Sequence, residues 1–101
     1  MAGVCRAEQP FKTVEADFGF GSVTIFYRKV NIYERRLIRA AHKKSDDDFY
    51  VENLFLRSRN ESGARLWNET ADKEKIEREF DPDEVDRVVN EMYAKEEPAG
   101  N

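Results

Sequence analysis

The chain has 101 residues, of which 38% are charged and 40% are hydrophobic, and its net charge is −4. This length suits one compact domain and leaves no room for a second independent core. The single cysteine, Cys5, excludes the disulfide-stapled secreted scaffolds, and no apolar run approaches the roughly 20 residues that cross a bilayer. We therefore expect one domain in a reducing cytoplasm, with no signal peptide and no membrane segment.

Charge is segregated along the chain. Residues 28–44 carry seven basic side chains and one acidic side chain, whereas residues 68–101 carry twelve acidic and five basic side chains. Such polarity favours oriented docking between molecules. It is equally satisfied within one molecule if the acidic half folds against the basic segment. Because a small domain buries limited surface, we expect a binding partner and a homo-oligomer.

The first predicted element is a β-hairpin over residues 11–29, preceded by a flexible N-terminus over residues 1–10. Apolar and polar side chains alternate along both halves of the hairpin, and Gly19 and Gly21 bracket its turn. The second half is apolar on both faces. This pattern predicts helices packed on one face and another chain on the other face or along the strand edge.

Four helices are predicted after the hairpin. Asn31 has the features of an N-cap, Asn68 or Thr70 is expected to cap the third helix, and Asp81 precedes a proline at the first helical position of the fourth. The expected fold class is α+β, with an N-terminal β-hairpin followed by about four α-helices. The expected helices cover residues 31–44, 46–59, 70–80 and 82–95, and a disordered tail covers residues 96–101.

The predicted helix over residues 31–44 is amphipathic and basic. Several basic side chains on one helix can neutralise phosphates, so a small regulatory nucleic-acid-binding protein is the alternative function. The acidic total and the lack of a groove-reading motif argue against nucleic acid as a partner, and a solvated or internally paired face is expected instead. The basic patch consists of Arg35, Arg36, Arg39, Lys43 and Lys44.

No residue pattern indicates catalysis. His42 is the one histidine, and the run Asp46-Asp47-Asp48 lacks the alternating ligands and central glycine of a calcium loop. The Gly19-Phe20-Gly21 turn lacks the third glycine and the following helix of a phosphate-binding loop. We expect no catalytic residues, no cofactor and no metal site. A small enzyme would need a carboxylate site that the sequence does not localise.

Aromatic side chains are concentrated in the predicted hairpin. A core packed by the helices accounts for one face of the hairpin, and the remaining aromatic residues are expected to contact a second subunit or another partner. The following helix adds two apolar candidates. The expected partner-binding residues are Phe18, Phe20, Phe26, Tyr27, Tyr33 and Leu37.

One order of segments runs from Phe11 to Met92. A predicted hairpin with a Gly-x-Gly turn comes first, and it is followed by Asn31-Ile32-Tyr33-Glu34-Arg35, Leu54-Phe55-Leu56-Arg57-Ser58, Asn60-Glu61-Ser62-Gly63-Ala64-Arg65-Leu66-Trp67 and Phe80-Asp81-Pro82-Asp83-Glu84-Val85. This order resembles the tail assembly chaperones of long-tailed, siphovirus-like bacteriophages. In that family a two-stranded N-terminal element precedes helices, and a core helix leads into an acidic, glycine-containing turn. A basic residue, a leucine and an aromatic residue follow the turn, and a helical end completes the pattern.

The resemblance implies a non-catalytic assembly factor that acts in the host cell cytoplasm and is absent from the mature virion. Such a protein binds the long, helical and aggregation-prone tape measure protein while tail tube subunits polymerise around it. The implied partners are therefore the tape measure protein and, beyond it, the tail tube protein. Members of the family are often also made in a longer, frameshifted form.

Overall fold

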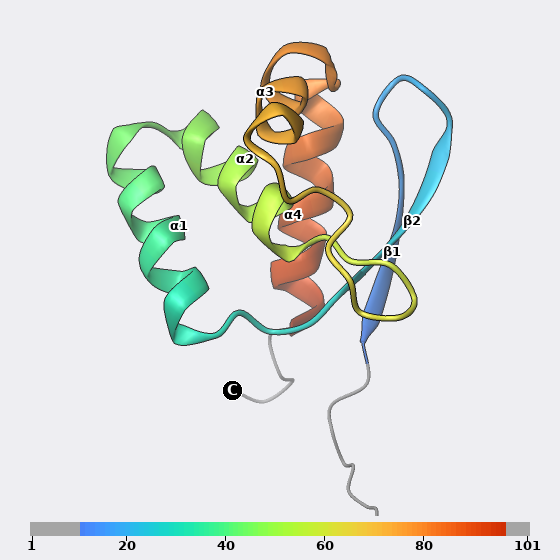
Figure 1. Ribbon diagram of the computed structural model, residues 1–101, viewed down its shortest axis with the longest axis horizontal. Helices are drawn as coiled ribbons and strands as arrows, with labels where there is room; N and C mark the ends of the chain where they lie inside the picture. The colour runs from blue at the N-terminus through green and yellow to red at the C-terminus, as the bar shows by residue number, and fades with distance from the viewer. Residues whose placement is uncertain (1–10, 97–101) are drawn as a thin grey trace, which may run out of the picture.

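The computed structural model describes residues 11–96 and has an α+β fold, which confirms the predicted hairpin and four helices (Figure 1). Glu96, expected in a disordered tail, is instead the last residue of the final helix. The flexible N-terminus predicted over residues 1–10 and the rest of that tail lie outside the described residues. The elements are β1 (Lys12–Asp17), β2 (Ser22–Tyr27), α1 (Ile32–Lys44), α2 (Asp46–Arg57), α3 (Thr70–Glu79) and α4 (Pro82–Glu96).

The hairpin has an antiparallel register that places Val14 opposite Ile25. Its turn is held by the carboxylate of Asp17, whose Oδ1 accepts hydrogen bonds from the backbone N–H groups of Gly19 at 2.9 Å and Gly21 at 3.2 Å. Both glycines have φ above +110°, a conformation that residues with a Cβ rarely adopt. The two glycines predicted to bracket the turn therefore allow backbone conformations that other residues rarely adopt.

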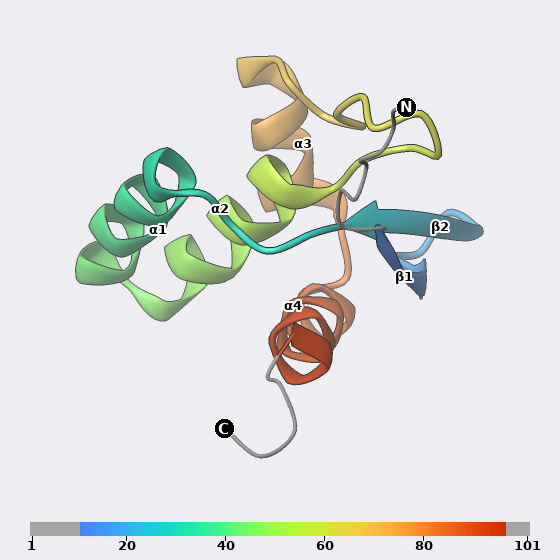
Figure 2. The ribbon, with the colours of Figure 1, turned by 90° about the horizontal axis from the view of Figure 1, so that it is seen from below.

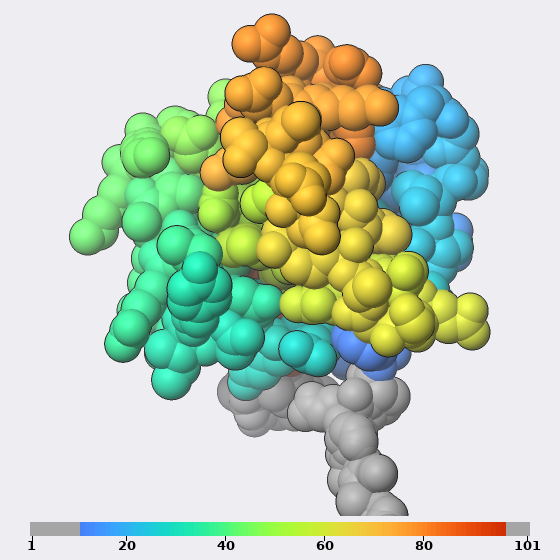
Figure 3. All heavy atoms as spheres, in the orientation of Figure 1, coloured from blue at the N-terminus to red at the C-terminus, as the bar shows by residue number. Residues whose placement is uncertain are grey.

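The core lies between the inner face of the hairpin and the helices α2 and α4, and α3 packs against α2 (Figure 1). Figure 2 shows α1 on the side of α2 that faces away from the hairpin, so α1 and the hairpin occupy opposite sides of the molecule. α1 packs mainly against α2. Most of its surface is therefore left for solvent or for a partner, and Figure 3 shows α1 along the outer side of the molecule. Core side chains include Val14, Ala16, Ile25, Leu54, Val88, Val89 and Met92.

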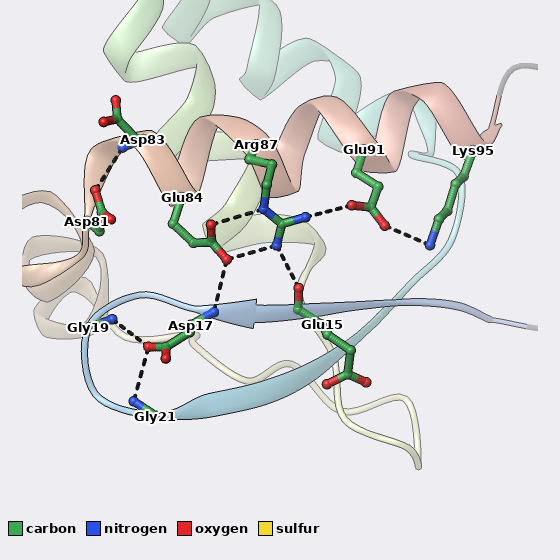
Figure 4. A network of polar contacts seen from close by, with 10 residues as sticks. All are labelled: Glu15, Asp17, Gly19, Gly21, Asp81, Asp83, Glu84, Arg87, Glu91 and Lys95. Carbon is green, nitrogen blue, oxygen red and sulfur yellow. Dashed lines mark hydrogen bonds and ion pairs between the residues drawn. The ribbon is translucent and has the colours of Figure 1, made fainter.

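The starts of α1 and α4 follow the predicted capping chemistry. Asn31 accepts a hydrogen bond from the backbone N–H of Glu34 at 2.8 Å, and the Glu34 carboxylate accepts one from the backbone N–H of Asn31 at 3.1 Å. At α4 the residue before Pro82 is Asp81, and its carboxylate accepts a hydrogen bond from the backbone N–H of Asp83 at 3.1 Å (Figure 4). Both helices begin where these side chains satisfy otherwise free backbone donors.

Helix α2 ends at Arg57, two residues before the predicted end. Ser58 leaves the helix while its hydroxyl donates a hydrogen bond to the Leu54 carbonyl at 2.7 Å. Arg59 then pairs with Phe26 of β2 through two backbone hydrogen bonds of 2.9 Å. The chain leaves the helix early because this residue joins the edge of the hairpin.

The start of α3 also differs from the prediction. Its N-cap is Glu69 rather than Asn68 or Thr70. The reason lies in Asp72, whose Oδ2 accepts hydrogen bonds from the backbone N–H groups of Asn68 at 3.2 Å and Glu69 at 3.1 Å. The helix ends at Glu79, one residue before the predicted end, because the next residue, Phe80, is extended and buried in the core.

Candidate partner-binding site

Two of the hairpin aromatics expected to contact a partner are buried in the core. Phe18 is 1% exposed and Tyr27 is 0% exposed. The Phe18 ring stacks on Phe80 with ring centroids 4.7 Å apart and meets Trp67 edge-on at 6.3 Å. The prediction that Phe18 and Tyr27 form a contact surface is wrong for the folded monomer, because the helices and the loop before α3 already cover both side chains.

The other two hairpin aromatics lie at the surface. Phe20 is 57% exposed at the turn. Its ring centroid lies 5.0 Å from that of Phe80, so one side of the ring packs against the cluster of Phe18, Trp67 and Phe80. Phe26 is half-buried. Its backbone N–H and carbonyl both bond to Arg59, which occupies this part of the β2 edge. The edge at Phe26 is therefore closed to an added strand.

The free edge of β1 is covered by charged side chains of α4 (Figure 4). Arg87 donates from Nη2 to the backbone carbonyl of Glu15 at 2.7 Å, and the backbone N–H of Asp17 donates to the Glu84 carboxylate at 3.0 Å. Arg87 also binds the carboxylates of Glu84 and Glu91. The hydrogen bond from Arg87 and, as the next largest cause, that from the Asp17 N–H lower the pKa of Glu84 to about 2.

Lys95 continues this covering toward the start of β1. Its ammonium group donates to the backbone carbonyl of Thr13 at 2.9 Å, and Lys12 donates in return to the backbone carbonyl of Lys95 at 2.9 Å. Exposed strand edges invite pairing with other chains, and inward-reaching charged side chains are one way in which proteins prevent it. Strand addition at β1, one of the expected modes of partner contact, would have to displace this network.

The two apolar candidates on α1 lie on one face of the helix. Tyr33, Leu37, Ala40 and Lys44 recur at spacings of four, three and four residues, which places them in one line along α1. Tyr33 is 68% exposed. The line runs beside a groove of about 180 Å³ between α1 and the helices α2 and α3. The groove is lined by Leu37, Ala40, Ala41, Lys44, Asp48, Glu52 and Lys73.

The basic patch is divided by the helix geometry. Lys44 lies at the end of the groove, whereas the other four basic residues lie on the outer face of α1 together with Ile32, which is 60% exposed. All five basic side chains are exposed, and within residues 11–96 none of them forms an ion pair. Among these residues, no carboxylate of the acidic C-terminal half therefore lies within ion-pair distance of the basic patch.

A buried arginine forms a second polar centre that sequence reasoning missed. Arg57 is 2% exposed, its guanidinium pairs with Glu96, and it lies over the rings of Tyr27 at 5.6 Å and Tyr93 at 5.0 Å. Burial raises the pKa of Glu96, and the adjacent Arg57 opposes that shift. The one available signal is a charged residue directly after the apolar run Leu54–Leu56. Its position at the junction of β2, α2 and α4 indicates a role in holding these elements together.

Within residues 11–96 no three His, Cys, Asp or Glu side chains are grouped so as to hold a metal ion. None of the described helices is both long enough and apolar enough to cross a membrane. Comparisons of the chain with protein-family models, with curated proteins and with solved structures found no match.

Proposed function

We propose that this protein is a non-catalytic tail assembly chaperone that binds the tape measure protein through the groove beside α1. The observation that carries the proposal is the position of Tyr33, which is 68% exposed and lies one helical turn before Leu37, on the face of α1 that carries the groove residues Leu37 and Ala40. Large aromatic side chains are common anchors for a protein partner. The sequence resemblance supplies the identity of the client.

The groove suits an amphipathic helix. Apolar side chains of such a helix recur every three or four residues, which is the spacing of Tyr33, Leu37 and Ala40 on α1. The wall of the groove that α2 and α3 contribute is charged and consists of Asp48, Glu52 and Lys73, of which Lys73 pairs with Glu52. An apolar line on α1 that faces charged side chains contributes both to the affinity and to the orientation of a bound amphipathic helix.

This arrangement matches the needs of a long helical client. A helix with an exposed apolar stripe aggregates until another surface covers the stripe. In the proposed role the chain covers segments of the tape measure protein in the host cytoplasm, and the tail tube protein displaces it as the tube polymerises. The chaperone would then be absent from the finished virion.

Coexpression tests this function. The tape measure protein is produced alone, with the wild-type chain and with the variant Ala40→Glu, which places a charge on an exposed groove position. We expect the wild-type chain to raise the soluble fraction of the client several-fold and the variant to lose that effect. Ala71→Glu introduces the same side chain at an exposed position of α3 that lines neither groove and should act like the wild type. Client solubility that is equal with and without the wild-type chain would rule the function out.

A second function is favoured by the outer face of α1. Four basic side chains there form no ion pair within the described residues, as expected of a surface that neutralises phosphates. Duplex DNA should then bind at about 50 mM salt and dissociate at about 200 mM salt, and Arg36→Glu/Arg39→Glu should abolish binding. Absence of binding at the lower salt concentration would exclude this alternative.

A further inference from the structure

A larger groove lies between the start of α2, the end of α3 and the start of α4. Its volume is about 410 Å³, within the range of pockets that hold a ligand or a large side chain. Buried side chains of Ile76, Phe80 and Val85 form its floor, and Tyr50 and Val51 line a half-buried wall. The groove does not overlap with the smaller groove beside α1, except that Asp48 lines both.

The rim of this larger groove is acidic. Four carboxylates, from Asp47, Asp48, Glu77 and Asp86, line it with a single basic side chain, Arg78. The carboxylates come from three different helices, and the charge of Asp47 on α2 acts on Asp86 of α4. Burial raises the pKa of Asp86, and the charges of Asp47 and Asp83 raise it further. A positively charged occupant would relieve this repulsion.

The same chain carries a surface of opposite charge and matching chemistry. The outer face of α1 presents Arg35, Arg36, Arg39 and Lys43 beside the exposed Ile32, and none of these basic groups is paired within residues 11–96. The face is a single rigid helix with both a cationic row and an apolar residue. The groove offers an acidic rim and an apolar floor.

We propose that copies of this protein associate head to tail, with the outer face of α1 of one copy docked in the acid-rimmed groove between α2, α3 and α4 of the next. The two surfaces are different patches of the chain, so each copy keeps one face and one groove available after pairing. Such heterologous contacts build rings when the rotation closes and open chains when it does not. The inference goes beyond the proposed function, because it needs no client and leaves Tyr33 outside the contact.

Complementary variants test the direction of this contact. The donor variant Arg36→Glu/Arg39→Glu reverses the charge of the helix face, and the acceptor variant Asp47→Lys/Asp86→Lys reverses the charge of the rim. Light scattering coupled to size exclusion should show wild-type assemblies heavier than the 11.8 kDa chain at about 50 mM salt and monomers at about 500 mM salt. Each variant alone should be monomeric at both salt concentrations.

A one-to-one mixture of the two variants is the decisive sample. One intact face and one intact groove remain between them, and the reversed face and the reversed rim are again opposite in charge, so the mixture should form assemblies of at least twice the chain mass. The matched control Lys29→Glu/Lys75→Glu makes the same charge change at exposed positions elsewhere and should assemble like the wild type. Circular dichroism confirms that each variant is folded.

Four results would overturn the proposal, three of them in the measurements of assembly. The wild type could remain monomeric at the lower salt concentration, the donor variant could still dimerise, or the mixture could fail to pair although both variants are folded. Assembly that disappears after nuclease treatment would also overturn it, in favour of nucleic acid as the ligand of the basic face. None of these outcomes affects the coexpression test, so the two proposals fail independently.

Discussion

Arg87 of α4 donates a hydrogen bond to the backbone carbonyl of Glu15 in β1 at 2.7 Å, and so binds a helix side chain to the edge of the hairpin. The same guanidinium pairs with carboxylates one turn before and one turn after it on α4. A two-stranded sheet is marginal in water by itself. The network therefore both attaches the hairpin to the helices and closes the edge at which another strand would add (Figure 4).

Removing Arg87 should expose this edge. Arg87→Met keeps the aliphatic stem but loses the hydrogen bond to Glu15, so we expect a loss of about 1 kcal/mol in the free energy of unfolding and faster aggregation on heating. Urea unfolding and static light scattering measure the two effects. Lys75→Met, at an exposed position of α3, serves as the control and should change neither. Equal aggregation of both variants would contradict the role of Arg87.

Glu84 should make stability depend on acidity. Its pKa is lowered from 4.5 to about 2 in the folded protein, so its ionised form stabilises the fold fully above pH 4.5 and the contribution disappears as the pH falls toward about 2. We expect Glu84→Gln to be less stable than the wild type by about 1 to 2 kcal/mol at pH 6, with the difference closing near pH 2.

The stability of the variant must be compared with that of the wild type, because the pKa values of other acidic side chains shift in the opposite direction. Burial raises the pKa values of Asp86 and Glu96, and this favours the fold at low pH and opposes it as the pH rises through the shifted values. The difference between the wild type and Glu84→Gln isolates the Glu84 contribution. A difference that stays constant from pH 6 to pH 2 would show that the Arg87 and Asp17 contacts do not stabilise the carboxylate.

The buried Tyr27 and the half-buried Tyr93 should respond differently to loss of the hydroxyl. The Tyr27 hydroxyl has no hydrogen-bond partner among residues 11–96, so Tyr27→Phe removes an uncompensated polar group and should leave stability unchanged or raise it. The Tyr93 hydroxyl donates to Asn53 at 2.8 Å, so Tyr93→Phe should lose about 1 to 2 kcal/mol. Thermal unfolding of both variants tests this, and equal losses would contradict the assigned partners.

The buried ion pair of Arg57 and Glu96 should be strongly coupled. Arg57→Met leaves the Glu96 carboxylate without its cation at a largely buried site and should lose about 3 kcal/mol or more. The double variant Arg57→Met/Glu96→Gln removes both charges and should be less destabilised than the sum of the two single variants. Chemical unfolding of the four proteins gives the coupling energy. Additive losses would mean that the pair does not act as a unit.

Local chemistry in the sequence was enough to predict most of the fold. Capping at Asn31 and Asp81, the glycine turn of the hairpin and the periodicity of α4 each depend on neighbouring residues, and the structure confirms them. The early end of α2 could not be predicted in this way, because it depends on the pairing of Arg59 with Phe26, 33 positions earlier in the sequence. Long-range contacts of this kind leave no local pattern.

Site prediction was limited by the same difficulty. The alternation in the hairpin predicts that Phe18 and Phe20 share a face. In the structure their environments differ, because Phe18 is buried under Trp67 and Phe80 while Phe20 lies in the turn and remains exposed. The spacing of Tyr33 and Leu37 correctly placed both on one face of α1. The groove beside that face depends on α3, whose docking against α2 no local pattern indicates.

The most direct test of the account compares Tyr33→Ala with Ile32→Ala. The two side chains are adjacent on α1 and almost equally exposed, but only Tyr33 lies in line with the groove. Each tagged variant is coexpressed with the tape measure protein, and the amount of client recovered per chain is measured. We expect the recovered client to fall about tenfold or more for Tyr33→Ala and to match the wild type for Ile32→Ala. Equal recovery of the client with both variants would contradict it.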